Sequence, residues 1–294
     1  TMYHALLPRI STKGDIGTVS GIGVAMGYIG TIVSLIAAYP ILKVIGWETL
    51  AGTKAMLLLT AVLFFVFSLA IFFLIKEKGH TKPHLIKEHV VSSLKDVKNT
   101  FAKLKAQKGL VPFLLSLIFY NDAINAVIIF LFLFGREVIG LSVQEFFFIY
   151  AVFAAAAATG SFFSGRIVDK IGSKKVLISA GFLWILVIVL LLNIKELAGF
   201  TIIGSIGGVA LGMVGTASRP KLIELAPKNR IAEYFGFFEL TDKFSGVLGP
   251  IIFGYLVFNY GYDIGLLSLA LFFIAGLVFL YLVPNFKENN TPVY

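Results

Sequence analysis

Eight long apolar stretches dominate the sequence and leave little choice of fold. A helix needs about 20 mostly apolar residues to cross the hydrocarbon core of a bilayer. The stretches that meet this length are residues 18–44, 52–75, 110–134, 143–167, 176–193, 198–218, 232–259 and 263–284. The strict alternation of barrel strands is absent, and backbone in lipid must satisfy its hydrogen bonds internally. The sequence therefore predicts an all-α membrane protein with eight transmembrane helices.

The composition excludes several other classes of protein. Apolar residues make up 58% of the chain and charged residues 14%, and the mean hydropathy is +0.91. A water-soluble domain does not have these values, so the expected partner is membrane lipid. The chain contains no cysteine, which excludes disulfides, thiolate nucleophiles and iron–sulfur sites.

The net charge of +9 is compatible with nucleic-acid binding, but the distribution of basic residues predicts none. If the N-terminus is cytoplasmic, most of the 25 lysines and arginines fall on the cytoplasmic side. The outer loops then carry only Lys43, Lys54, Arg136 and Lys195. By the positive-inside rule, both termini are cytoplasmic. The richness in Phe, Ile and Lys without cysteine favours a bacterial inner membrane.

One hydrophilic segment divides the spans unevenly, with two before it and six after it. Helical transporters are commonly built from repeated halves. We therefore expect residues 1–75 to form the last two helices of an incomplete N-terminal half. Residues 76–109 form a basic cytoplasmic linker with an amphipathic helix, and residues 110–294 form a complete six-helix C-terminal half.

A glycine- and lysine-rich string between the fourth and fifth spans predicts a hinge loop. Asp169 is expected to accept hydrogen bonds from free backbone N–H groups at the start of the first span, and to meet Arg219. Such a contact would bias the equilibrium between outward-facing and inward-facing states. The alternative is a topogenic loop whose lysines simply stay inside. The predicted gating residues are Gly165, Asp169, Lys170, Gly172, Lys174, Lys175 and Arg219.

These strings resemble a known family of transporters. The segment 165–175 is similar to the signature between the second and third helices of a half in the major facilitator superfamily, with Lys170 where arginine is usual. Segments 20–30, 120–122 and above all 232–250 resemble the autophagy-related vacuolar amino-acid effluxer family, which has bacterial members. The resemblance implies twelve helices, so we expect the first four to be lacking. It also implies amino acids as substrates, and a monomer when full length.

Ionisable residues inside spans are the candidates for the transport pathway, because a charge near the bilayer centre is costly and normally faces the bundle interior. Glu239 and Lys243 have the spacing of a helical ion pair, and Asp242 lies beside them. In the third span, Asp122 is a candidate proton-coupling site between Asn121 and Asn125. The alternatives are a structural ion pair for the first group and helix-to-helix hydrogen bonding for the second.

Small residues at close-packing intervals predict helix contacts, because small residues let helix backbones approach in lipid. Sliding surfaces for a rocking motion are a second interpretation. The predicted packing residues are Gly23, Gly27, Gly204, Gly208, Gly212, Gly246, Gly249 and Pro250.

The sequence thus favours a secondary active transporter of small polar solutes, most plausibly amino acids, that works by alternating access. It predicts no metal and no cofactor, apart from possible proton coupling. One alternative is a truncated remnant that does not transport. The other, a membrane-embedded lipid-modifying enzyme, is disfavoured because the spans contain no histidine.

Overall fold

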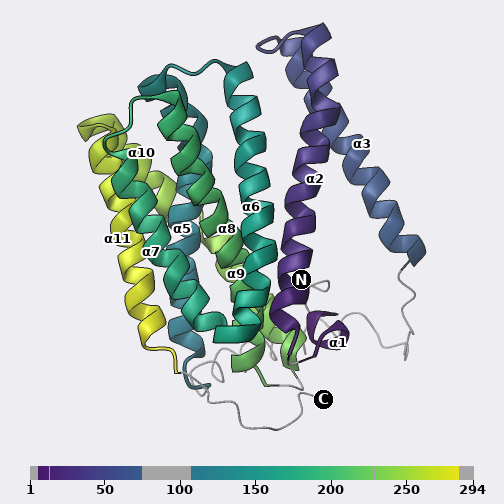
Figure 1. Ribbon diagram of the computed structural model, residues 1–294, viewed down its shortest axis with the longest axis vertical. Coiled ribbons are helices and arrows are strands. Elements are labelled where there is room, and N and C mark those ends of the chain that lie inside the picture. The colour runs from purple at the N-terminus through teal and green to yellow at the C-terminus, as the bar shows by residue number, and fades with distance from the viewer. Residues whose placement is uncertain (1–5, 13, 75–106, 228–229, 285–294) are drawn as a thin grey trace, which may run out of the picture. The chain divides into compact units, whose positions relative to one another are not determined.

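The described part of the chain is helical throughout. The computed structural model describes residues 6–12, 14–74, 107–227 and 230–284. The helices, shown in Figure 1, are α1 (Leu7–Ile10), α2 (Ile16–Ile45), α3 (Leu50–Leu74), α5 (Leu110–Phe134) with its π-helical extension η2 (Gly135–Ile139), α6 (Val143–Ile171), α7 (Ser173–Leu191), α8 (Leu197–Leu225), α9 (Ile231–Phe244), α10 (Leu248–Tyr260) and α11 (Tyr262–Tyr281). No strand occurs among these residues.

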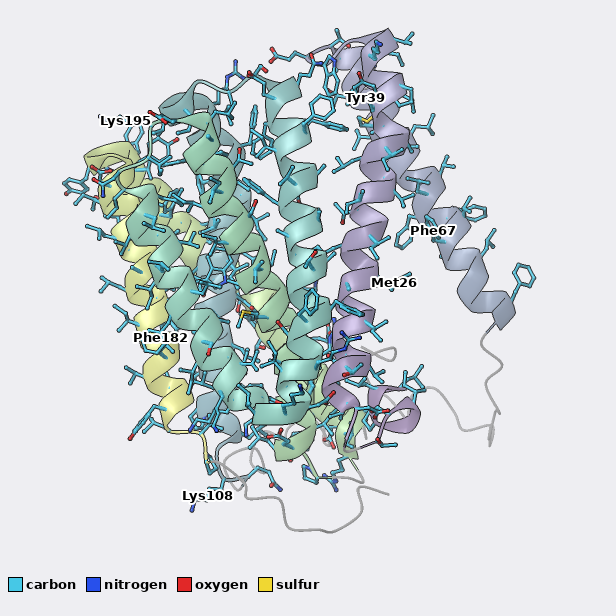
Figure 2. The ribbon with its side chains drawn as sticks, in the orientation of Figure 1. Met26, Tyr39, Phe67, Lys108, Phe182 and Lys195 are labelled. Carbon is cyan, nitrogen blue, oxygen red and sulfur yellow. The ribbon has the colours of Figure 1, made fainter. Side chains whose placement is uncertain are left out.

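Seven helices in the described ranges are long and apolar enough to cross a membrane. They are α2, α3, α5 with η2, α6, α7, α8 and α11. The chain is therefore an all-α integral membrane protein, as predicted. Apolar side chains cover its outer surface, and Phe182 on α7, for example, is 61% exposed (Figure 2).

The predicted seventh span, residues 232–259, is not one continuous helix. It is divided into α9, of 14 residues, and α10, of 13 residues. Gly246 lies between them with a φ of +93°, a conformation that glycine adopts without steric cost. Pro250, in the first turn of α10, lacks an N–H but sits where helix N–H groups have no intrahelical partner. The local sequence thus ends one helix and begins another.

The prediction of a loop at residues 165–175 is also wrong. Helix α6 continues through Gly165 and Asp169 to Ile171, and α7 begins at Ser173. Only Gly172 separates the two helices, with a φ of +89°. Because this one glycine makes the whole turn, the polar residues before it remain helical and keep fixed positions on α6.

The chain forms two compact units, one of residues 1–31 with 107–294 and the other of residues 32–106. In the first unit α8 packs against α6 and α7, while α11 packs against α5, α7 and α10 (Figure 1). Lys108 and Lys195 lie at opposite ends of this unit (Figure 2). The second unit contains the later part of α2 and α3.

The sequence-based domain boundaries at 75 and 110 remain a prediction. In the second unit, the rings of Tyr39 and Trp47 lie 6.1 Å apart between centroids. The amphipathic helix expected in the linker 76–109 falls mostly on residues 75–106, which are outside the described ranges.

The glycines of α8 form the predicted close contact with α6. A Cβ at Gly204 would overlap the ring of Phe153, and one at Gly208 would lie 2.6 Å from the Phe153 carbonyl oxygen. A Cβ at Gly212 would lie 2.7 Å from the backbone nitrogen of Ser161. At Gly208 and Gly212 the nearest atoms belong to the α6 backbone, so a larger residue there would separate the two helices.

On α2, a packing role for Gly23 and Gly27 stays a prediction. A Cβ at Gly27 would meet no described atom within 4 Å, and Gly23 is only half-buried. The close contact of α2 lies nearer its N-terminus, as described below.

Candidate functional site

The Asp169 carboxylate binds the first turn of α2. Its Oδ1 accepts a hydrogen bond of 2.6 Å from the Gly17 backbone N–H. Its Oδ2 accepts from the Thr18 backbone N–H at 2.9 Å and from the Thr18 hydroxyl at 2.6 Å. The first N–H groups of a helix have no intrahelical acceptor and carry partial positive charge. These hydrogen bonds confirm the predicted contact with the start of the first span; a gating role for it remains a prediction.

Glycine at three positions allows this contact to form. A Cβ at Gly17 would lie 2.5 Å from the Gly165 carbonyl oxygen, and one at Gly21 would lie 2.5 Å from the Ser161 carbonyl oxygen. Conversely, a Cβ at Gly165 would lie 2.6 Å from the Gly17 carbonyl oxygen. The backbones of α2 and α6 therefore touch directly, side by side in Figure 1. Gly165 thus lies in a helix contact and not in the predicted loop, and its partner Gly17 is not among the predicted packing residues.

A buried hydrogen-bond chain joins the same two helices to α8. The Ser20 hydroxyl donates to the Thr216 carbonyl oxygen at 2.8 Å, and the Thr216 hydroxyl donates to the Ser161 carbonyl oxygen at 3.3 Å. All three side chains are at most 2% exposed. The hydrophobic effect does not drive helices together in lipid, so interhelical hydrogen bonds of this kind contribute to their association.

The remaining predicted gating residues have different surroundings. The side chains of Lys170 and Lys175 are exposed, and that of Arg219 on α8 is half-buried. Lys174 donates from Nζ to the carbonyl oxygens of Tyr281 at 3.1 Å and Val283 at 2.5 Å. Lys174 thus binds the backbone at the end of α11.

One lysine beyond the predicted sixth span, which ends at residue 218, is buried. Lys221 lies on α8, is 2% exposed, and forms an ion pair of 2.8 Å with Glu224. The Ser173 hydroxyl at the start of α7 donates to the same carboxylate at 3.2 Å. This cluster fixes α7 to α8 at the end where Gly172 makes its turn.

Asp122 caps the second part of the broken span. Its Oδ1 accepts hydrogen bonds from the backbone N–H groups of Gly246 at 2.8 Å and Gly249 at 3.0 Å. Asp122 is 1% exposed, so the carboxylate compensates the free N–H groups at the start of α10. A Cβ at Gly249 would overlap the Asp122 backbone carbonyl, which confirms the predicted packing role of Gly249.

The predicted polar face of the third span, on α5, contacts the predicted seventh span, which contains α9. Asn121 donates to Asp242 at 3.3 Å, and the Asn125 amide is the nearest neighbour of a Cβ built at Gly246, at 3.0 Å. Gly246 therefore also packs against α5.

The predicted partner of Lys243 is wrong. Its ion-pair partner is Asp242, at 3.9 Å, and not Glu239. The Lys243 side chain is 78% exposed, while Glu239 is half-buried on α9. The i to i+4 rule describes an isolated helix, whereas α9 ends at Phe244, one residue after this lysine.

The first compact unit also contains a cavity of about 110 Å³ that the sequence did not predict. Its lining comes from α2, α5, α6, α7 and α8, and is mostly apolar or aromatic. The lining residues are Tyr28, Thr31, Val127, Ile128, Leu131, Tyr150, Phe153, Ala154, Ala157, Trp184, Val187, Leu191, Phe200, Gly204, Gly207, Gly208 and Leu211. At a rise of about 1.5 Å per residue, Tyr28 lies roughly 16 Å along α2 from Gly17.

A helical membrane bundle with a discontinuous span is typical of helical membrane transporters. The family described as "Vacuole effluxer Atg22 like" matches residues 11–291. The chain belongs to this family, which confirms the resemblance seen in its sequence.

Three relatives are similar to this chain over most of its length. The protein named "Uncharacterized MFS-type transporter YxiO" of Bacillus subtilis is 24% identical over 299 residues, which cover 99% of this chain and 68% of the relative. An uncharacterized protein of Aquifex aeolicus is 25% identical over 258 residues, 87% of this chain and 60% of the relative. Autophagy-related protein 22-1 of Aspergillus fumigatus is 25% identical over 307 residues, 95% of this chain and 49% of the relative. The chain thus spans about half to two thirds of these relatives.

Proposed function

We propose that this protein takes part in secondary active transport of small polar solutes, most plausibly amino acids, by alternating access. The proposed location is a bacterial inner membrane with both termini in the cytoplasm. Asp122 is the proposed site of proton coupling, and Asn121, Asn125, Glu239, Asp242 and Lys243 accompany it in the proposed pathway. The proposed oligomeric state is a monomer.

The observation that carries this proposal is the contact between Asp169 and the start of α2. Under the proposed division, α2 belongs to the N-terminal half and α6 to the C-terminal half. Alternating access requires contacts between halves that form on one side of the membrane and break when that side opens. Three hydrogen bonds to one carboxylate form such a contact, because they are directional and are lost together when the helices separate.

Flux of radiolabelled amino acids in proteoliposomes tests the proposed function. The assay compares the 294-residue chain with the longest chain that its gene encodes, under proton gradients of both signs. We expect amino-acid flux that falls by most of its rate in Asp122→Asn, Glu239→Gln and Lys243→Ala. Flux of other polar solutes alone would overturn the amino-acid assignment. Flux by neither chain would favour a non-transporting protein, and altered lipid in the vesicles would favour an enzyme.

Asp169→Asn is expected to open the contact between α2 and α6. An amide has one oxygen where the carboxylate has two, so at least one donor of Gly17 or Thr18 loses its acceptor. A hydrogen bond to a charged group is worth about 1.5–3 kcal/mol, which corresponds to a shift of roughly ten- to hundredfold in the equilibrium. The measurement is the labelling rate of Ser20→Cys by an impermeant maleimide, in a chain that has no other cysteine. Ser20 is 2% exposed, so labelling reports opening.

The matched control is Asp15→Asn, which removes the same charge at the same helix end. Asp15 accepts only from Thr12, at 2.5 Å from its N–H and 2.8 Å from its hydroxyl, among the described residues. These hydrogen bonds hold the pKa of Asp15 below its usual value, so Asp15 is ionised at neutral pH. We expect unchanged Ser20→Cys labelling in Asp15→Asn. Equal acceleration in both variants would mean that net charge, and not the Asp169 contact, controls opening.

A further inference from the structure

The break between α9 and α10 brings two helix ends of opposite polarity beside Asp122. Helix α9 ends at Phe244, α10 begins at Leu248, and Asp122 accepts from the Gly246 N–H between them. The last C=O groups of a helix carry about half a negative charge, and the first N–H groups carry about half a positive charge. Because these partial charges nearly cancel, the charge at the break is that of the Asp122 carboxylate.

One oxygen of this carboxylate has no partner in the described part of the chain. The hydrogen bonds from Gly246 and Gly249 both go to Oδ1, and none goes to Oδ2. Asp122 is 1% exposed, but packing does not seal Oδ2. Among the described side chains that are not exposed, only Trp184 Nε1 is both unpartnered and fully enclosed. Asp122 Oδ2 therefore keeps free lone pairs and a surface that a small ligand can contact.

No basic side chain in the described ranges neutralises Asp122. The ion pairs of these ranges join other residues, and Lys243 pairs with Asp242 while remaining 78% exposed. Burial of a carboxylate without an opposite charge is strongly unfavourable, and an ionisable residue inside a membrane span normally marks an ion pathway or a proton relay. The carboxylate therefore needs a proton or a bound cation.

Further oxygen atoms near the break accept no hydrogen bond from the described residues. Asn125 lies three residues after Asp122, on the same face of α5, and its amide has no hydrogen bond within the described ranges. The amide nitrogen lies 3.0 Å from a Cβ built at Gly246, and half a turn of an amide exchanges its nitrogen and oxygen. At the end of α9, the carbonyl groups of residues 242–244 receive no backbone N–H from the described part of the chain.

These groups select the kind of ligand. All of them are oxygen acceptors, which bind hard cations, whereas a proton uses only one of them. A single carboxylate balances one positive charge, and the described residues hold no group of three or more histidine, aspartate or glutamate side chains that would suit a divalent metal. Unwound carbonyl groups and half-helix C-terminal ends bind sodium in discontinuous transporter helices.

We propose that the break between α9 and α10 binds a monovalent metal ion. Asp122 Oδ2 is its charged ligand, and the Asn125 amide and the free carbonyl groups of α9 supply neutral oxygen ligands. The ion competes for Oδ2 with the coupling proton of the proposed function. Binding does not depend on transport, so failure of the flux assay would leave the site standing, and failure to bind sodium would leave proton coupling at Asp122 standing.

Equilibrium binding of radioactive sodium to the purified chain in a non-ionic detergent tests the site. The immobilised protein is titrated in a scintillation-proximity assay, with choline chloride added to keep the ionic strength constant. We expect saturable binding that unlabelled sodium displaces. Choline carries the same charge on a bulky quaternary ammonium group, so it should not displace the ion.

Asp122→Asn is the decisive variant. It removes the charged ligand but retains an oxygen that can accept from Gly246 and Gly249, so the chain should keep its fold, which its elution in size-exclusion chromatography checks. We expect an apparent sodium affinity weaker by about a hundredfold or more in Asp122→Asn, and by about tenfold in Asn125→Ala.

Asp263→Asn is the matched control, because it removes one exposed carboxylate from the first turn of α11. This variant should bind sodium like the parent. The proposal would be overturned by a parent chain without saturable sodium binding, or by undiminished affinity in Asp122→Asn or Asn125→Ala. An equal loss of affinity in Asp263→Asn and Asp122→Asn would also overturn it, because net charge would then explain the binding.

Discussion

Asp122→Ala is expected to lower the free energy of unfolding by roughly 2–6 kcal/mol, because each of two donors left without an acceptor costs about 1–3 kcal/mol. The variant removes the oxygen that accepts from both Gly246 and Gly249. Those two N–H groups lie at the break between α9 and α10, where no helical carbonyl replaces the carboxylate. The measurement is unfolding in a titration with sodium dodecyl sulfate, followed by far-ultraviolet circular dichroism.

Asp122→Asn separates the structural role of this residue from proton coupling. Both hydrogen bonds go to one oxygen, Oδ1, and an amide retains one such oxygen. Since asparagine and aspartate are similar helix N-caps, we expect the stability of the Asp122→Asn variant to stay within about 1 kcal/mol of the parent. Proton coupling, in contrast, requires the titratable group and is lost.

Asn121, next to Asp122 in the chain, provides the control for the two Asp122 variants. Asn121→Ala removes one exposed hydrogen bond of 3.3 Å to Asp242, so its expected effect is within about 0.5 kcal/mol. If Asp122→Asn destabilised the chain as much as Asp122→Ala, the capping account of this carboxylate would be wrong.

Sequence reasoning succeeded where one local signal decides the structure. The Ser142 hydroxyl accepts from the Glu145 N–H while Glu145 accepts from the Ser142 N–H. This capping box places the start of α6 at Val143, where the predicted span 143–167 begins. The Asp169 contact was also predictable, because free N–H groups at a helix start attract a carboxylate wherever the fold brings one near.

Hydropathy failed where it was used to locate the ends of helices. Hydropathy reports which residues lie in lipid, and not which residues are helical. It therefore predicts a loop at the polar end of α6, which is helical to Ile171. The break at Gly246 was missed for the opposite reason, because the residues around it are apolar. The Ser-Gly and Gly-Pro pairs at 245–246 and 249–250 were the available signals.

Tertiary context decided the features that no local pattern carries. Lys221 is buried because α8 continues to Leu225, past residue 218 where the predicted span ends. The cavity combines residues of five helices, from Tyr28 to Leu211, so no sequence period marks it. Only the placement of the helices brings Trp184 to its wall.

Gly21→Ala is expected to force α2 and α6 apart. The added Cβ would lie 2.5 Å from the Ser161 carbonyl oxygen and 3.0 Å from the Gly165 Cα. Both are backbone atoms, so no side-chain rotation relieves the overlap and the helices must move. Overpacking of this kind costs about 1–3 kcal/mol. The measurements are the free energy of unfolding and the maleimide labelling rate of Ser20→Cys.

Gly27→Ala on the same helix has the opposite expected sign. A Cβ there meets no described atom within 4 Å, and replacing a helical glycine by alanine stabilises a helix by about 0.5–1 kcal/mol. Gly21→Ala should also disturb the 2.8 Å hydrogen bond from Ser20 to Thr216, since both depend on the same approach of the helices. A Gly21→Ala chain as stable and as slowly labelled as Gly27→Ala would show that the two backbones do not touch. The Asp169 contact would then lack the close helix approach that brings its carboxylate to Gly17.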